Sequence, residues 1–248
     1  MNKTILCFLT TTLAGLSTTL GIIPCFFKTK NQNSMITNSF SFASGVMITI
    51  TIISLIPEAI SNLNNTFKKF PALLICSIFI VLGIIISATI EENENKKKNN
   101  NQLYTIGIIT TLAMIIHNIP EGITTFIFSN INQKLGIKLA ISIAMHNIPE
   151  GISIAIPIYY ATNNRKKAFI NTFIAGFSEL FGAIIAFLFF KKISTLMLSI
   201  ILSITAGIML NISISELLPT VYKNEKSKTI IYYFALGIIF MFITEIII

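Results

Sequence analysis

The chain has 248 residues, of which 53% are hydrophobic and only 11% are charged, and its formal net charge is +8. Its apolar runs are longer than the strands or amphipathic helices of a soluble domain, so a soluble fold is excluded. The positive charge is spread over short connections, and nothing in it indicates a nucleic-acid partner. A bilayer core needs about 17–25 predominantly apolar residues for each spanning helix. The composition therefore predicts an all-α, polytopic membrane protein whose surroundings are the lipid bilayer.

Polar residues divide the chain into eight apolar segments, each long enough to cross a bilayer. We expect spanning helices over residues 4–27, 36–60, 71–90, 103–128, 136–160, 167–190, 194–221 and 229–248. The longest connection, EENENKKKNNNQ at residues 91–102, is predicted to be a solvated linker, because its hydrophobicity is too low for folding. The whole chain, residues 1–248, is predicted to be one transmembrane domain.

The distribution of Lys and Arg predicts the orientation, since cytoplasmic loops carry an excess of these residues. For eight alternating spans, the connections after spans 1, 3, 5 and 7 hold eleven Lys and Arg residues, whereas the opposite side holds seven. We therefore expect both termini outside and the 91–102 linker in the cytoplasm. The composition, rich in Asn, Lys and Ile, is associated with bacteria, so a bacterial plasma membrane is the expected location.

Acidic residues are rare and unevenly placed in this chain. It contains no Asp, and five of its ten Glu fall well within predicted spans, with a sixth in the last turn: Glu58, Glu121, Glu150, Glu179, Glu216 and Glu245. A carboxylate in the middle of a membrane costs a few kcal/mol, so it should face the interior of the bundle and have a partner. The only two histidines, His117 and His146, lie close to two of these acids in the sequence.

The heptapeptide HNIPEGI occurs twice, starting at His117 in span 4 and at His146 in span 5. On a helix, positions three and four apart are neighbours, so Glu121 should lie beside both His117 and Asn118. Pro120 cannot donate a hydrogen bond to the carbonyl of Ile116, which bends the helix and frees a backbone acceptor. One such motif alone could be a buried ion pair that fixes packing. Two identical copies favour a binding site.

Two such helices facing each other would bring together imidazole, amide and carboxylate groups, and Glu179 in span 6 is the obvious third carboxylate. The candidate metal ligands are His117, Asn118, Glu121, His146, Asn147, Glu150 and Glu179. Nitrogen and oxygen donors without thiolate suit Zn, Fe(II), Mn, Co or Cd more than Cu(I). The number of donors indicates two ions. We predict no catalytic residue and no catalytic cofactor.

A second internal similarity surrounds the first. The segment SGVMITITIISLIP at residues 44–57 resembles AGIMLNISISELLP at residues 206–219, in spans 2 and 7. These spans would run in opposite directions, which is the mark of an inverted repeat with its binding site near the midplane. The sequence thus favours three spans, a central pair and three further spans.

The two HNIPEG motifs, the AIPIYYAT that follows the second, and GFSELFGA in span 6 resemble the ZIP family of divalent-metal transporters, in its short bacterial ZupT-type branch. The resemblance covers essentially the whole chain. It implies an eight-helix bundle with 3+2+3 organisation that moves metal toward the cytoplasm. It also implies two metal positions. The first would use His117, Glu121, His146 and Glu150, and the second Asn118, Asn147 and Glu179, with Glu121 and Glu150 bridging.

Two other classes of protein stay open at this stage. One is an intramembrane metal-dependent hydrolase, in which the metal would activate water, although the peptidase signature HExxH is absent. The other is a metal-dependent scaffold or receptor that transports nothing. Metal preference, proton coupling, channel-like or alternating transport, a homodimer, and the roles of Glu58 and Glu216 are also open.

The outer half of span 5 carries a candidate gate. Leu139, Ile143, His146 and Glu150 are separated by four, three and four residues, so they share one helix face. An ion entering from outside would pass two bulky aliphatic side chains before it reached a ligand. Apolar constrictions of this kind exclude ions by denying them hydration.

Overall fold

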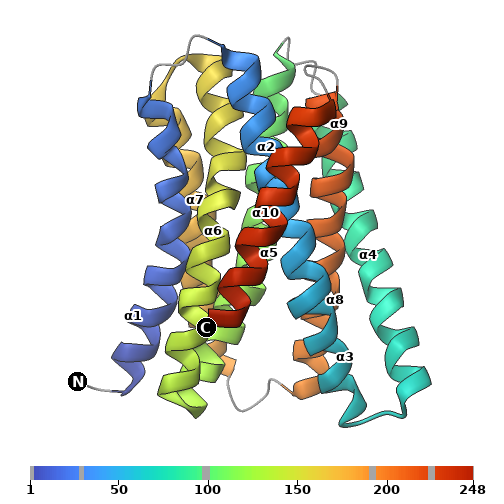
Figure 1. Ribbon diagram of the computed structural model, residues 1–248. Coiled ribbons are helices and arrows are strands. Elements are labelled where there is room, and N and C mark those ends of the chain that lie inside the picture. Colours follow the sequence, from blue (N-terminus) through green and yellow to red (C-terminus); the bar gives the residue numbers. More distant parts are fainter. Residues whose placement is uncertain (1–2, 28–30, 97–100, 190–193, 223–226, 248) are drawn as a thin grey trace.

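The computed structural model describes residues 3–27, 31–96, 101–189, 194–222 and 227–247. Over these residues the chain forms helices and no strand (Figure 1). Eight helical spans are long and apolar enough to cross a membrane: Lys3–Phe26, Gln32–Asn64, Lys69–Glu94, Gln102–Ile131, Gln133–Thr162, Arg165–Phe189, Thr195–Tyr222 and Lys228–Ile247. The expected all-α, eight-span architecture is confirmed.

Three of the spans are not uniform α-helices. Span 1 is α1 (Lys3–Leu16) followed by the 3₁₀-helix η1 (Ser17–Phe26). Span 2 is α2 (Gln32–Ile50), the π-helical η2 (Thr51–Leu55) and α3 (Ile56–Asn64), and span 7 is α8 (Thr195–Asn211), the π-helical η4 (Ile212–Leu217) and α9 (Leu218–Tyr222). The other spans are α4 (Lys69–Lys96), α5 (Gln102–Ile131), α6 (Gln133–Thr162), α7 (Arg165–Phe189) and α10 (Ser227–Ile247).

A one-residue turn holds the two HNIPEG helices side by side. Asn132 ends α5 and caps α6, and its side-chain oxygen accepts hydrogen bonds from the backbone N–H groups of Lys134 and Leu135. Asn is a favoured N-cap because its side chain satisfies donors that the first helical turn leaves unpaired. A connection this short makes α5 and α6 antiparallel neighbours.

The predicted linker at residues 91–102 is partly helical. Helix α4 continues through its first half and ends at Lys96, and α5 begins at Gln102, leaving residues 97–100 outside the described chain. Glu and Lys are good helix formers once a helix has been nucleated, so α4 extends beyond the apolar run that predicted it. The single-domain prediction and the cytoplasmic position of this segment stay predictions.

The π-helical segments reveal the inverted repeat directly. Both lie in the two segments that resemble each other in sequence, each beginning within a few residues of the Gly-x-Met motif and ending just before the Pro. Because spans 2 and 7 run in opposite directions, the same local distortion appears twice with opposite orientation. The expected 3+2+3 inverted-repeat arrangement therefore has a structural counterpart.

Close glycine contacts connect spans 1, 4, 5 and 6 into one group and join the other spans in two pairs, 2 with 8 and 3 with 7. A Cβ atom added to any of these glycines would collide with the backbone of the facing span. The backbones of the two helices are therefore in direct contact at each glycine. The contacts are Gly15 with Gly176, Gly21 with Gly151 and Gly122 with Gly182 in spans 1, 4, 5 and 6, and Gly45 with Gly237 and Gly83 with Gly207 in spans 2, 3, 7 and 8. Figure 1 shows α1, α6 and α7 on one side of the bundle and α4 and α8 on the other.

Candidate metal centre

The two HNIPEG motifs lie in the interiors of α5 and α6, where Pro120 and Pro149 are accommodated without ending the helices. The seven candidate ligands are all buried, with exposed fractions between 0% and 4%. Burial of this many polar side chains in an apolar bundle is costly unless they have partners.

The imidazole and carboxylate groups of the two motifs are in direct contact. The Nε2 atom of His146 lies 3.1 Å from Oε1 of Glu121, and the Nε2 atom of His117 lies 3.4 Å from the same oxygen and 3.3 Å from Oε1 of Glu150. Two ligands of one tetrahedral zinc ion, with bonds of about 2.0–2.1 Å, stand about 3.3–3.4 Å apart. The pairwise spacing therefore matches that of donors around a small divalent ion.

Asn147 connects this cluster to spans 1 and 6. Its Nδ2 atom donates to Oε1 of Glu179 at 2.6 Å and to the backbone carbonyl of Ala14 at 3.1 Å. Both contacts use the amide nitrogen, so the amide oxygen is left for another partner. The Ala14 carbonyl also accepts a hydrogen bond from Oγ of Ser17 at 2.6 Å.

Asn118 is held in a parallel way by span 6 alone. Its Nδ2 atom donates to the carbonyl of Ala175 at 2.9 Å, and that carbonyl also accepts from Oγ of Ser178 at 2.5 Å. The two amides differ in one contact. Asn147 also donates to Glu179, and the structure shows no such bond from Asn118. Glu179 in turn lies within electrostatic range of Glu121 and Glu150.

Each of the seven candidate ligands keeps at least one buried polar atom without a hydrogen-bond partner. These atoms are Nδ1 and Nε2 of His117, Oδ1 of Asn118, Oε2 of Glu121, Nδ1 of His146, Oδ1 of Asn147, both carboxylate oxygens of Glu150 and Oε2 of Glu179. A buried polar atom that stays unpaired costs about 1–3 kcal/mol. Seven side chains with such atoms in one cluster form a candidate site for a cation, whose charge would compensate the unpaired oxygens.

The donors contact one another as they stand. Among the described residues, no three His, Cys or Glu side chains are already arranged to hold an ion. Metal binding would therefore require side-chain rotations that turn three or more of these donors toward one point. The structure brings His117, Glu121, His146 and Glu150 into mutual contact and joins Asn147 to Glu179. It places Asn118 against the backbone of span 6.

Comparison with known proteins places the chain in a family. Residues 87–245 match a family model described as "ZIP Zinc transporter". Two proteins named "Zinc transporter ZupT" are similar over nearly their whole length: that of Clostridium perfringens is 37% identical over 97% of this chain and 95% of its own, and that of Campylobacter jejuni is 37% identical over 94% and 93%. The chain belongs to the ZIP family.

This result confirms the prediction, made from the two HNIPEG motifs, that the chain resembles ZIP transporters. The relatives are named as transporters, not as enzymes, so the comparisons favour transport over the hydrolase. With its eight spans, the chain is a multi-pass membrane protein.

Two cavities lead from the end of the ZIP bundle where α6 begins toward the candidate ligands. The wider one, of about 300 Å³, is lined by residues that include Leu135, Lys138 and Glu245. The narrower one, of about 30 Å³, is lined by Ile143, His146 and Glu121 among others. The two share Ser54, Glu58, Leu139 and Ser142. The wider cavity, here called the vestibule, therefore leads into the narrower one, here called the neck, which ends at the candidate ligands His146 and Glu121.

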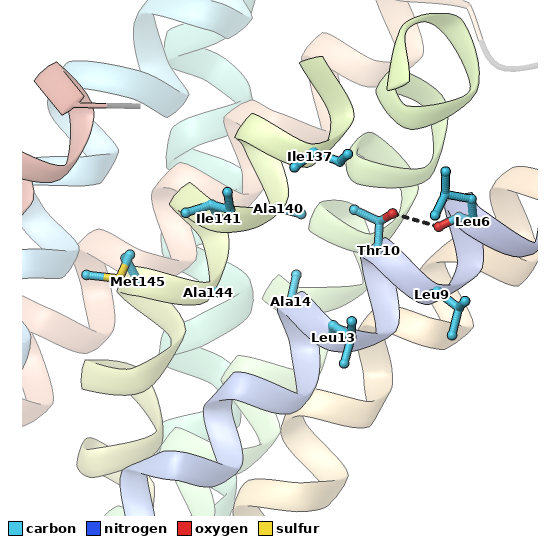
Figure 2. A pocket seen from close by; sticks show the side chains of 10 residues that line it. All are labelled: Leu6, Leu9, Thr10, Leu13, Ala14, Ile137, Ala140, Ile141, Ala144 and Met145. Atoms are coloured by element: carbon cyan, nitrogen blue, oxygen red, sulfur yellow. Dashed lines mark hydrogen bonds between the residues drawn. The ribbon is translucent and has the colours of Figure 1, made fainter. Parts of the chain in front are cut away.

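A separate groove between α1 and α6 offers no such route. It has a volume of about 430 Å³ and is lined almost entirely by apolar side chains, among them Leu13, Ile141 and Met145 (Figure 2). The hydroxyl of Thr10 in its wall donates to the carbonyl of Leu6. The groove thus presents hydrocarbon to its surroundings, and an ion would find no ligand in it.

The backbone carbonyls of Ala14 and Ala175, which accept hydrogen bonds from the two amides, were not predicted from the sequence. Their signal is present in the sequence: AGLSTTLG at residues 14–21 and AGFSELFG at residues 175–182 share Ala, Gly, Ser and Gly at the same four positions. The first octet contains Ala14 and Ser17, and the second contains Ala175 and Ser178. This match lies in spans 1 and 6 and extends the inverted repeat of spans 2 and 7.

Proposed function

We propose that this protein carries divalent metal ions, zinc foremost, across the membrane into the cytoplasm through a binuclear centre in spans 4, 5 and 6. The proposal rests on one observation above all: seven buried side chains from three spans each leave a nitrogen or oxygen atom unpaired in one cluster. The ZupT relatives, named as zinc transporters, support zinc as the ion. Iron, manganese, cobalt and cadmium are proposed as further substrates, because they accept the same donors.

In this proposal the first ion is held by His117, His146, Glu121 and Glu150. The second ion is held by Asn118, Asn147 and Glu179, and Glu121 and Glu150 bridge the two. The contact of Oε1 of Glu121 with both imidazoles supports a central position for this carboxylate. The carboxylates supply the negative charge that offsets two doubly positive ions.

We further propose that the vestibule with Glu245 faces the outside. The excess of Lys and Arg on the opposite side favours both termini outside. The start of α1 and the far end of α10 lie toward the end of the bundle where α6 begins, which is the end with the vestibule (Figure 1). Ions would enter past Glu58 and Glu245 and leave at the end that carries the α4–α5 connection.

Uptake of radioactive zinc into proteoliposomes tests the proposal. We expect Glu121→Ala to reduce uptake to background, because this change removes the carboxylate that contacts both histidines. The matched control is Glu92→Ala, which removes an exposed carboxylate near the end of α4. Normal uptake by correctly folded Glu121→Ala protein would refute the proposed centre, and a panel of competing ions in the same assay ranks the metals.

A further inference from the structure

The repeated octets in spans 1 and 6 give each residue of 175–182 a counterpart in residues 14–21. In AGLSTTLG and AGFSELFG the fifth residues are Thr18 and Glu179. The separation of 161 residues is within one residue of the separation between the repeated segments of spans 2 and 7. Thr18 is therefore the equivalent, in the first half of the protein, of a proposed metal ligand in the second half.

The backbone reproduces this equivalence around the centre. The carbonyl of Glu179 lies against Gly122, and the carbonyl of Thr18 lies against Gly151, so that a Cβ on either glycine would collide with it. Each glycine directly follows one of the two proposed bridging carboxylates in the sequence. Thr18 thus approaches α6 beside its motif in the way that Glu179 approaches α5.

Side-chain positions follow the same symmetry. A Cβ on Gly15 would stand 2.8 Å from Cβ of Glu179, and a Cβ on Gly176 would stand 3.1 Å from Cβ of Thr18. Spans 1 and 6 cross at Gly15 and Gly176. The side chains of Thr18 and Glu179 therefore begin at similar distances from this crossing.

The hydroxyl of Thr18 differs from those of its neighbours in span 1. Thr10, Thr11 and Thr19 each donate to a backbone carbonyl three or four residues earlier. Thr18 is fully buried, and its Oγ1 atom has no hydrogen-bond partner. An unpaired hydroxyl is unfavourable in an apolar interior, and Glu179 likewise keeps Oε2 unpaired.

We propose that Thr18 contributes a neutral oxygen to the metal centre, as the first-half counterpart of Glu179. This inference rests on the proposed function, since it assumes the centre formed by the two HNIPEG motifs. A hydroxyl attracts a divalent ion less strongly than a carboxylate does. The centre is therefore asymmetric: the side lined by span 1 holds an ion weakly, and the side lined by span 6 holds it tightly.

Isothermal titration of purified, detergent-solubilised protein with zinc tests the role of the hydroxyl. We expect Thr18→Val to weaken zinc binding about two- to tenfold, the contribution of one neutral polar group. The matched control is Thr11→Val, because Thr11 is also fully buried in span 1 but donates to the carbonyl of Cys7. Equal affinities of the two variants would overturn the proposal.

An exchange of the two residues tests the equivalence itself. Glu179→Thr should weaken zinc binding, and adding Thr18→Glu should restore at least part of the lost affinity by moving the carboxylate to the other side of the centre. A double variant that binds no better than Glu179→Thr alone, while its thermal unfolding shows it to be folded, would contradict the assignment.

Glu121→Ala separates failure of this inference from failure of the proposed function. If Glu121→Ala abolishes zinc binding while Thr18→Val and the exchange have no effect, only the role of Thr18 is wrong. If Glu121→Ala binds zinc normally, the centre itself is wrong, and the proposal for Thr18 falls with it.

Discussion

At the scale of single residues, Asn118 and Asn147 carry the same amide group in the same motif but have different surroundings. Each donates to a backbone carbonyl of a neighbouring span, and Asn147 also donates to Glu179 at 2.6 Å. That these two residues belong to a site was predictable from sequence, because polar side chains are rare in apolar spanning helices and are costly there without a partner. The partners were not, because which carbonyl an amide reaches depends on how the helices cross.

The extra bond of Asn147 predicts a specific coupling in metal-free protein. Replacing Asn147 or Glu179 by Ala removes the same hydrogen bond, so the double variant should be more stable than the sum of the two single effects predicts, by about 0.5–3 kcal/mol. Each single effect also includes the loss of the other contacts of the replaced side chain, and the coupling isolates the shared bond. Unfolding of the detergent-solubilised variants measures it.

The pair Asn118 and Glu179 is the control for this cycle. The structure gives these two side chains no shared hydrogen bond, so their effects on metal-free stability should add within about 0.5 kcal/mol. Equal coupling in both pairs would show that the bond between Asn147 and Glu179 is not a feature of the protein in solution.

At the scale of helices, the apolar runs predicted all eight spans, whereas the departures from α-helix were not predicted. Segments η2 and η4 carry ordinary residues such as Ile, Ser and Leu, and a π-helical turn has no compositional signature. Such turns occur often at functional sites, and Ser54 and Leu55 of η2 line the neck before the ligands. The glycines had a signal in the sequence, but their partners depend on the packing.

Gly122 provides the sharpest test of helix packing, because it lies next to Glu121 and against the backbone of Glu179. A methyl group there meets only backbone atoms of α7, so we predict that Gly122→Ala costs about 1–3 kcal/mol of stability and reduces zinc uptake by separating α5 from α7. Thermal unfolding and proteoliposome uptake measure the two effects.

Gly107→Ala is the matched control in the same helix. A Cβ on Gly107 would first meet a side-chain atom of Ile158, whereas a Cβ on Gly122 first meets a backbone oxygen. A side chain adjusts more readily than the backbone of a packed helix, so the change should cost less than at Gly122. A Gly107→Ala variant that loses as much stability and uptake as Gly122→Ala would show that close approach of the α5 and α7 backbones is not what the centre requires.

At the scale of the whole molecule, the inverted repeat explains why the site has contributions from both halves. One repeated segment in spans 2 and 7 was enough to predict the inversion, and the octets of spans 1 and 6, the π-helical segments and the glycine contacts all follow it. The symmetry is imperfect in the positions of the acidic residues. Ser54 and Glu58 of span 2 correspond to Glu216 and Thr220 of span 7, so each span carries one Glu, one helical turn apart in the two repeats.

The neck around Ile143 connects this architecture to transport. Ile143 is 3% exposed and packs with Ala14 and Ala140, and it lines the cavity of about 30 Å³ between the vestibule and His146. That volume holds one or two water molecules, too few for the hydration shell of a divalent ion. The spacing of Leu139, Ile143 and His146 predicted a shared face, and the cavity has that face as one wall.

Cysteine labelling from outside tests the neck and the orientation together. In a protein whose Cys7, Cys25 and Cys76 have been replaced, we predict that a membrane-impermeant thiol reagent added outside modifies Leu135→Cys readily, since Leu135 is half exposed and lines the vestibule. Ile143→Cys, two turns further along α6, should react at least about tenfold more slowly in the absence of metal, because we expect a neck this narrow, with aliphatic side chains in its wall, to exclude a charged reagent. Equal labelling rates at the two positions would show that no constriction protects the centre. If the reagent labels Leu135→Cys only from the opposite side of the membrane, the orientation is reversed, and Ile143 would then guard the exit of the pathway.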